Sequence, residues 1–273
     1  MGVRSFHMSE HLSIYDSELL KLTRHGHTLV ITISHPPANT WTKQSLNDLS
    51  QLIRSVTNER DIYTLIITGE GDKFFSAGAD LSLFADGDPE TARAIAHSFG
   101  TAFEALSEFR GLTIAAINGY AMGGGLEVAM ACDLRIAESQ AKMALPEASV
   151  GLLPCAGGTQ NLPHLVGEGW AKRMILCGER VDADTAAKIG LVEVVVETGE
   201  ALTTALAWAK QAEKQSPLAV GACKQLIQHG RKNPMWQGLE KEREYFVSLF
   251  GTADQAEGVQ AFLEKRAPVW RNS

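Results

Sequence analysis

The chain has 273 residues, of which 45% are hydrophobic and 21% charged, and its formal net charge is −7. This composition is ordinary for a globular protein, and the length suffices for a large core without disulfides or a structural metal. The acidic balance argues against nucleic acid as the main partner, because phosphate binding needs a basic surface. An anionic small ligand stays compatible, because a helix N-terminus can bind one.

Targeting and redox features are absent from the sequence pattern. Residues 1–16 contain no apolar segment of the kind that marks a secretory signal, and no apolar run is long enough to span a bilayer. The four cysteines form no Cys-x-x-Cys pair and have no histidines at zinc spacing, which favours free thiols in a reducing compartment. We therefore predict a flexible leader over residues 1–16 and a cytoplasmic protein with no membrane or metal association.

Strand and helix patterns alternate along the first two thirds of the chain. Short runs rich in β-branched residues predict strands, and apolar residues three and four apart predict helices. The first two strands flank Gly26 and form a predicted hairpin. This alternation predicts an α/β core with mostly parallel strands. The predicted strands are residues 19–25, 28–34, 63–68, 113–118, 133–137 and 141–145, and the predicted helices lie around residues 46–56, 89–109 and 126–131.

The pattern changes after residue 196. Four successive segments with helical periodicity follow, and no internal repeat or low-complexity segment is visible. We therefore expect a core over residues 17–196 that carries the site and a helical C-terminal region over residues 197–273. The four predicted C-terminal helices are residues 201–212, 218–229, 235–250 and 253–265.

A glycine triplet, Gly123-Gly124-Gly125, joins a predicted strand to a predicted helix. Three glycines remove every Cβ from the turn, so a ligand can approach the backbone closely. The first N–H groups of a helix have no intrahelical acceptor and are ready donors for an anion. Such a triplet taken alone is more often a tight turn with close strand–helix packing.

A second small-residue turn, residues 76–80 with the sequence Ser-Ala-Gly-Ala-Asp, also follows a buried strand. Asp80 is a candidate N-cap, which leaves the N–H of Ala79 available to a ligand. Two such turns at neighbouring ends of parallel strands would lie beside each other, where α/β proteins place their ligands. Two converging backbone N–H groups make an oxyanion hole, and each donor contributes about 3 kcal/mol at the transition state.

Two glutamates accompany these turns. Glu127 lies on the first helical turn after the glycine triplet, and Glu147 lies in an apolar stretch rich in glycine. Either one alone is more often a surface acid or a helix-start residue. A buried carboxylate, however, has reason to be functional, and two beside two donor turns fit proton transfer around an enolate.

The order of these motifs resembles the crotonase (enoyl-CoA hydratase/isomerase) superfamily. The resemblance covers almost the whole chain, and the motifs in this order and spacing are specific together although each is modest alone. They are Phe-Ser-Ala-Gly-Ala-Asp-Leu (residues 75–81), Ala-Ile-Asn-Gly-Tyr-Ala-Met-Gly-Gly-Gly-Leu-Glu (116–127), Leu-Pro-Glu (145–147) and Gly-Gly-Thr-Gln (157–160).

The resemblance implies a spiral of ββα repeats with a helical C-terminal region that assembles a homotrimer or a dimer of trimers. It implies an acyl-CoA thioester substrate and no metal or redox cofactor, because the thioester itself accepts the electrons. Ala79 and Gly124 match the oxyanion-hole donors of the family. The residues that match its coenzyme A site are Ala77, Ala79, Asp80, Leu81, Ser82 and Gly124.

The presence of both glutamates resembles the hydratases of the family. It implies hydration of a trans-2-enoyl-CoA to the 3-hydroxyacyl-CoA, in which Glu127 helps activate the water and Glu147 delivers the proton to C2. The alternatives are a Δ3,Δ2-enoyl-CoA isomerase or another acyl-CoA enzyme of the family, and a subunit that binds acyl-CoA without turnover. Product analysis separates the hydratase from the isomerase. The intact glutamates argue against the subunit that binds acyl-CoA without turnover.

Three positions depart from the hydratase pattern. Cys155 and Asn161 stand where hydratases usually have glycine and arginine, and Trp41 replaces the usual leucine near the expected coenzyme A entrance. The resemblance places Cys155 near the catalytic water, where its side chain could narrow the pocket. Nothing in the sequence plainly lowers the pKa of this thiol, so a nucleophilic role is not expected. These departures bear on substrate range rather than on fold.

Overall fold

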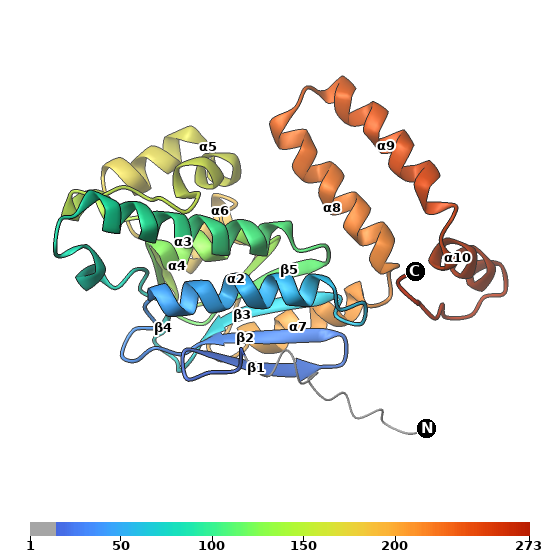
Figure 1. Cartoon of the computed structure of the whole chain (residues 1–273), viewed down its shortest axis with the longest axis horizontal. Coiled ribbons are helices and arrows are strands. Elements are labelled where there is room, and N and C mark those ends of the chain that lie inside the picture. Colours follow the sequence, from blue (N-terminus) through green and yellow to red (C-terminus); the bar gives the residue numbers. More distant parts are fainter. Residues whose placement is uncertain (1–14) are drawn as a thin grey trace.

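The computed structural model describes residues 15–273, and it confirms the predicted crotonase-type α/β fold. Two sheets are surrounded by helices, as Figure 1 shows. Residues 1–14 of the predicted leader lie outside the described residues. Asp16, the last residue of that leader, accepts a hydrogen bond from the Leu22 backbone N–H at 2.9 Å.

The larger sheet has six strands in the order β1-β2-β3-β5-β7-β10. β1 and β2 pair antiparallel with His25 opposite Thr28, which confirms the predicted hairpin. Every other neighbouring pair in this sheet is parallel. The strands are β1 (Leu20–His25), β2 (Thr28–Ile33), β3 (Thr64–Gly69), β5 (Leu112–Ile117), β7 (Leu134–Glu138) and β10 (Val194–Val196).

Both faces of the larger sheet are covered, which explains the nearly continuous apolar sequence of its central strands. Side chains alternate between the faces of a strand. In β3, Leu65 and Ile67 join the main core cluster under α2 (Lys43–Thr57). Ile66 points the other way and packs with Ala205 and its neighbours on α7 (Ala201–Ala212). The first helix after the predicted boundary at residue 197 therefore packs directly on the core sheet.

A smaller sheet has the order β4-β6-β8-β9, and of its strands the sequence predicted only β8, within residues 141–145. The other three strands are too short for an alternation pattern to stand out from a turn. β4 and β8 both pair in parallel with β6. The strands are β4 (Phe74–Ser76), β6 (Tyr120–Met122), β8 (Lys142–Ala144) and β9 (Val181–Asp182).

Successive ββα units build a spiral. In the units that begin at β3, β5 and β7, one strand enters the larger sheet, the next enters the smaller sheet, and a helical segment follows. Equivalent strands of consecutive units are neighbours, so β3, β5 and β7 adjoin in one sheet and β4, β6 and β8 in the other. The helical segments that follow are α3 (Pro89–Glu108), α4 (Gly124–Ala131) and α5 (Gly158–Leu176), with the short α6 (Ala183–Lys188) after β9.

Asn118 ties the two sheets together where the chain passes from β5 to β6. Its buried side-chain amide donates to the carbonyl oxygens of Gly69 and Gly71, at 2.8 and 2.7 Å, and accepts from the Gly69 N–H at 3.0 Å. These bonds satisfy backbone groups that the end of β3 leaves unpaired. The turn that leads into β4 is therefore fixed against the start of β6.

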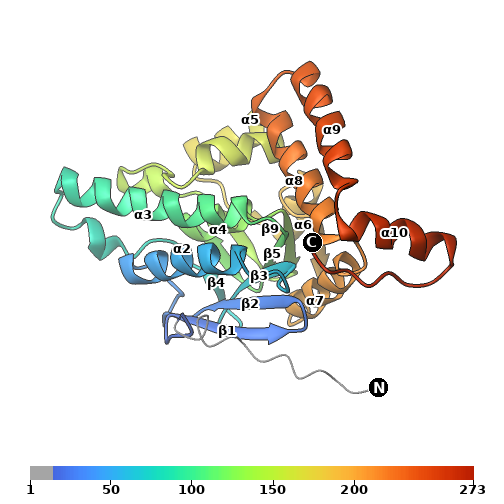
Figure 2. The ribbon, with the colours of Figure 1, turned by 45° about the vertical axis from the view of Figure 1, so that its right-hand side comes forward.

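The last helices project from the body of the protein. α8 (Pro217–Lys232) and α9 (Met235–Leu249) run side by side away from the sheets, and α10 (Ala253–Leu263) lies near the C-terminus, as Figures 1 and 2 show. Asp254, at the start of α10, accepts hydrogen bonds from the backbone of Arg271 and Asn272. Within residues 15–273, no helix is both long and apolar enough to cross a membrane.

Candidate active site

The two predicted donor turns lie side by side, because they follow two strands that pair in parallel. Ser76 ends β4 and Met122 ends β6. A Cβ built on Gly78 would lie 2.7 Å from the Met122 carbonyl oxygen and 3.0 Å from the Gly124 nitrogen. One built on Gly125 would lie 2.1 Å from the Ser76 carbonyl oxygen. Such close packing requires glycine on both sides, and it brings the backbones of the turns together.

The backbone of Trp41 orients the first turn. Its N–H donates to the Gly78 carbonyl at 2.8 Å, and its carbonyl accepts from the Asp80 N–H at 3.2 Å. These two bonds form an isolated parallel bridge opposite Ala79. In a parallel bridge the opposed residue directs its own N–H to the other side. No described residue accepts a hydrogen bond from the Ala79 N–H, so this donor is available to a ligand.

The second donor comes from the N-terminus of α4. Gly123 precedes the helix and its own N–H donates to the Ala144 carbonyl at 2.9 Å. Gly124 is the first helical residue, and its N–H has no intrahelical acceptor. Within the described part of the chain no other group accepts from it either. The helix dipole adds a favourable field for negative charge at this position.

Glu127 is held beside the donor turns by the start of α5. Its side chain is 2% exposed, and Oε1 accepts hydrogen bonds from the backbone N–H groups of Ala156 and Gly158, both at 2.8 Å. Burial raises the pKa of the Glu127 carboxyl, and the two backbone hydrogen bonds offset part of that rise. With Oε1 fixed in this way, Oε2 is the oxygen left for substrate or water.

Glu147 lies next to the glycine triplet. A Cβ on Gly123 would lie 3.1 Å from its Oε1, and its Oε2 is buried with no hydrogen-bond partner among the described residues. Burial raises the pKa of the Glu147 carboxyl to about 7, and the negative charge of Glu127 adds to the rise. A carboxyl with this pKa can both donate and accept a proton near neutral pH.

One cavity of about 450 Å³ joins these groups. Ala79, Gly124, Glu127 and Glu147 all line it, so the structure brings together the four residues predicted to be catalytic. Apolar side chains from residues 81–84, from the loop after Glu147 and from α3 form much of the remaining wall. They include Leu81, Phe84, Phe99, Val150, Leu152 and Leu153.

The residues predicted to contact coenzyme A fall into two groups. Ala77 and Leu81 line the cavity together with Ala79. Asp80 and Ser82 lie outside its lining, because the Asp80 carboxylate turns back to accept from the Ser82 N–H at 3.0 Å and caps the short helix η1 (Leu81–Phe84). The sequence-based role of this segment in coenzyme A binding stays a prediction.

The three departures from the hydratase pattern have different positions. Cys155 lines the cavity. Desolvation by the surrounding protein, together with the negative charges of Glu127 and Glu147, raises the pKa of its thiol to about 11. A thiol with this pKa is a poor nucleophile at neutral pH. Asn161 lies outside the catalytic cavity. The Trp41 side chain is fully buried and packs edge-on against Phe103, so it is a core residue and not a wall of an entrance.

Three polar lining residues escaped the sequence analysis, and one of them, Ser149, lies in the loop after Glu147. Thr40 lies beside the first donor turn, and Arg180 comes from the end of the segment that precedes β9. The pairing of β9 with β8 brings Arg180 close to the loop that carries Glu147. No sequence signal marks this arginine, because a two-residue strand creates the contact.

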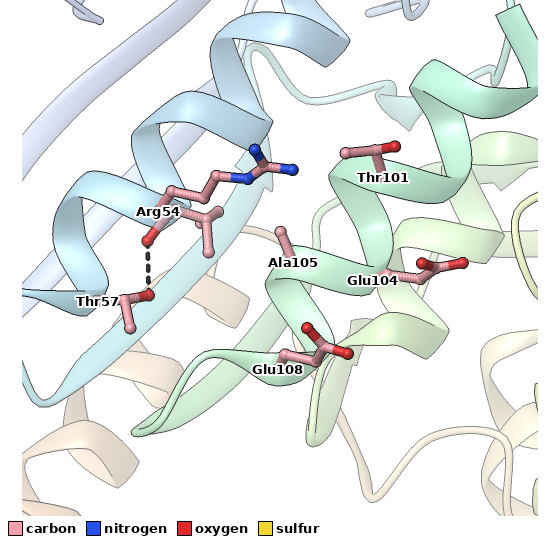
Figure 3. Close-up of a pocket in the computed structure, with 7 residues that line it drawn as sticks. Arg54, Thr57, Thr101, Glu104, Ala105 and Glu108 are labelled. Atoms are coloured by element: carbon pink, nitrogen blue, oxygen red, sulfur yellow. Dashed lines mark hydrogen bonds between the residues drawn. The ribbon is translucent and has the colours of Figure 1, made fainter.

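A second concave site, between α2 and α3, has a different character. Arg54 and Thr57 from α2 and Thr101, Glu104 and Glu108 from α3 line it, and Figure 3 shows the Glu104 carboxylate pointing away from α2. This groove shares no lining residue with the catalytic cavity. It has no pair of free backbone donors at the end of a strand, and we assign it no chemistry.

Comparison with known proteins identifies the family. A family model described as enoyl-CoA hydratase/isomerase matches residues 23–273. The chain belongs to the enoyl-CoA hydratase/isomerase family. It is 38% identical to a short-chain-enoyl-CoA hydratase of Clostridium acetobutylicum, over 90% of this chain and 94% of that protein. It is 37% identical to a carnitinyl-CoA dehydratase of Salmonella typhi, over 93% of this chain and 99% of that protein.

Solved structures of the family agree with this fold. DspI of Pseudomonas aeruginosa superimposes with a TM-score of 0.92 at 61% identity, covering 99% of this chain and all of that chain. An enoyl-CoA hydratase of Bacillus anthracis superimposes with a TM-score of 0.90 at 35% identity, covering 93% of this chain and all of that chain. The family resemblance drawn from the motifs is therefore confirmed.

Proposed function

We propose that this protein hydrates a trans-2-enoyl-CoA to the 3-hydroxyacyl-CoA. One observation carries the proposal: two carboxyls with raised pKa values line the same cavity as two free backbone N–H groups. The N–H groups of Ala79 and Gly124 would bind the thioester oxygen. Glu127 and Glu147 would hold the water and exchange protons with it.

The chemistry needs only these groups. Water attacks C3, its oxygen forms the new C–O bond, and the electrons of the double bond move to the thioester oxygen as an enolate. The two N–H donors stabilise that negative charge. Glu127 takes a proton from the attacking water, and Glu147 gives a proton to C2 as the enolate collapses. The thioester is the electron sink, so the proposal includes no metal or redox cofactor.

The relatives support an acyl-CoA hydro-lyase activity. One is named a hydratase and another a dehydratase, and these names describe addition and removal of water in the same kind of reaction. An acyl-CoA thioester is accordingly the proposed substrate, with the backbone of residues 77–82 beside its pantetheine. Nucleic acid and membrane are not proposed as partners.

Isomerisation of a 3-enoyl-CoA is the second candidate. The observation that favours it is the pKa of about 7 at Glu147, because one carboxyl that gains and loses a proton near neutral pH could move it between C2 and C4. This reaction needs no second carboxylate. The hydrogen-bonded Glu127 in the same cavity therefore favours hydration.

Purified protein incubated with crotonyl-CoA tests the proposal. The enoyl absorbance should fall and 3-hydroxybutyryl-CoA should form. Conversion of a 3-enoyl-CoA to the 2-enoyl-CoA without any hydroxylated product would instead support the isomerase. Tight binding of enoyl-CoA substrates without conversion would contradict both.

The pKa of Glu147 predicts a pH dependence. Hydration requires one proton on the glutamate pair, and that proton is lost as pH rises through about 7. We expect kcat/KM to fall about tenfold for each pH unit above this value. Because the reaction consumes no net proton, dehydration should show the same fall. The check is a rate profile from pH 6 to 9 in both directions, and a flat profile would contradict the assignment.

We also propose that the projecting helices assemble a homotrimer or a dimer of trimers. Large apolar side chains on α9 and α10 are exposed in the single chain, and exposed patches of this kind mark protein contacts. Light scattering should give three or six times the 29.5 kDa of the chain, and Phe262→Asp should lower that mass. A monomeric wild-type protein would contradict the proposal. The exposed residues include Met235, Trp236, Phe246, Phe262 and Leu263, together with Phe250 just after α9.

A further inference from the structure

A second cavity of about 680 Å³ adjoins the catalytic one. Its walls come from the C-terminal half of α3, the first turns of α5 and the end of α8. Among all the described residues that line either cavity, Cys155 alone lines both. We call the second cavity the distal chamber.

The lining of the distal chamber changes from apolar to polar. Its buried residues are Phe103, Ala131 and Ala156, and each is apolar. Apart from Cys155, its exposed residues carry polar or charged side chains, so the rim meets solvent and the floor does not. An aliphatic chain gains by covering an apolar floor, because the apolar area leaves water. The exposed polar lining residues are Glu104, Glu108, Gln160, His164, Arg231 and Lys232.

We propose that the Cys155 side chain is the gate between the catalytic cavity and the distal chamber, and that it determines which linear acyl chains the protein accepts. Chains longer than crotonyl would pass Cys155 and lie on the floor of the distal chamber. This proposal rests on the function proposed above, because it concerns the acyl group of the same enoyl-CoA.

The position of Cys155 relative to the reacting carbons supports this role. Cys155 lines the catalytic cavity together with Glu127 and Glu147, and the N–H of the next residue donates to Glu127 Oε1 at 2.8 Å, so Cys155 lies beside the carboxyls that would exchange protons with C2 and C3. The next acyl carbons must leave the space between these carboxyls. At that place Cys155 lines both the catalytic cavity and the distal chamber.

The backbone around the gate is fixed, so the side chain sets its width. The N–H of Ala156, the next residue, is bound to Glu127 Oε1 at 2.8 Å. The N–H of Gly158 is bound to the same oxygen. Movement of this segment would break the hydrogen bonds of a buried carboxylate, which is costly. A substitution at residue 155 therefore changes the opening more than the path of the chain.

The test compares kcat/KM for trans-2-octenoyl-CoA and crotonyl-CoA. Each methylene that loses its apolar contact reduces kcat/KM about fourfold. Cys155→Trp should therefore lower the octenoyl-to-crotonyl ratio at least tenfold, and Cys155→Gly should not lower it. An unchanged ratio in Cys155→Trp would overturn the gate.

A second variant blocks the chamber beyond the gate. Asn161→Trp adds bulk inside the distal chamber and does not touch the catalytic cavity. It should lower the same ratio. Thr101→Trp is the matched control, because Thr101 lies on α3 but lines neither the catalytic cavity nor the distal chamber, and it should leave the ratio at its wild-type value. Equal octenoyl-to-crotonyl ratios in Asn161→Trp and Thr101→Trp would overturn the distal chamber as the acyl site.

Inhibition gives a readout that is independent of turnover. The inhibition constants of octanoyl-CoA and butyryl-CoA should converge in Cys155→Trp and in Asn161→Trp, but not in Thr101→Trp. Converging constants support the gate, and constants that keep their wild-type spacing contradict it. If wild-type protein fails to hydrate crotonyl-CoA, the proposed function fails. If the wild-type protein hydrates crotonyl-CoA but the variants keep its chain-length profile, the gate proposal fails and the proposed function stands.

Discussion

Glu147→Gln is expected to slow hydration of crotonyl-CoA by roughly a hundredfold or more. Glutamine keeps the size of the side chain, but it cannot give a proton to C2 or take one back. Glu147 has its pKa raised to about 7, and this carboxyl exchanges a proton at neutral pH more readily than an ordinary glutamate. Initial rates at saturating crotonyl-CoA measure the effect on kcat.

The control for this variant is Glu168→Gln on α5. Glu168 is exposed and pairs with Lys172 on the surface, so its loss should leave the rate unchanged. Both variants should bind butyryl-CoA as the wild type does, which separates a lost proton transfer from a damaged site. Full activity of Glu147→Gln would remove Glu147 from the mechanism.

Gly78→Ala is expected to lower kcat/KM at least a hundredfold. Its Cβ would lie 2.7 Å from the Met122 carbonyl and 3.0 Å from the Gly124 nitrogen, so the two donor turns must separate. Loss of one oxyanion donor alone costs about a hundredfold to a thousandfold in kcat. Gly78 also has a φ of 90°, where an alanine is strained.

Gly71→Ala is the matched control for the strain. Gly71 lies in the turn before β4 with a φ of 83°, but a Cβ there would meet no atom within 4 Å. Each variant should lose about 1–3 kcal/mol of stability from the positive φ, which thermal unfolding measures. Only Gly78→Ala should lose the activity. Similar activity in the two variants would show that close packing of the turns is not required.

Much of the site was predictable because its residues follow local rules. Glycine triplets and small-residue turns indicate that another group can approach the backbone closely. Helix geometry alone places Glu127 one turn after Gly124. The adjacency of the turns was predicted from parallel pairing of the strands before them. The strands that pair are the short β4 and β6 rather than the long strands of the larger sheet.

The features that were missed arise from tertiary contacts. Three of the four strands of the smaller sheet, β4, β6 and β9, were missed because strands of two or three residues are too short for a periodic pattern. α5 contains Pro163, and it is kinked at the non-helical Gly167, so the helical signal in the sequence is interrupted. Trp41 was expected at an entrance, but its side chain fills the core while its backbone orients Ala79.

The buried carboxylates explain how fold and chemistry are coupled. The turn at the start of α5 holds the Glu127 carboxylate in place, because two of its N–H groups donate hydrogen bonds to one carboxylate oxygen. The same turn carries Cys155 to the boundary of the distal chamber. The arrangement that places the proton-transfer group therefore also positions the residue proposed to select the acyl chain.

Product analysis in water enriched in heavy oxygen tests the central claim most directly. Wild-type protein is incubated with crotonyl-CoA, and in parallel with the corresponding 3-enoyl-CoA, and the products are weighed by mass spectrometry. The proposed site predicts 3-hydroxybutyryl-CoA that carries one heavy oxygen at C3. Migration of the double bond without oxygen incorporation, or no conversion of either substrate, would contradict it.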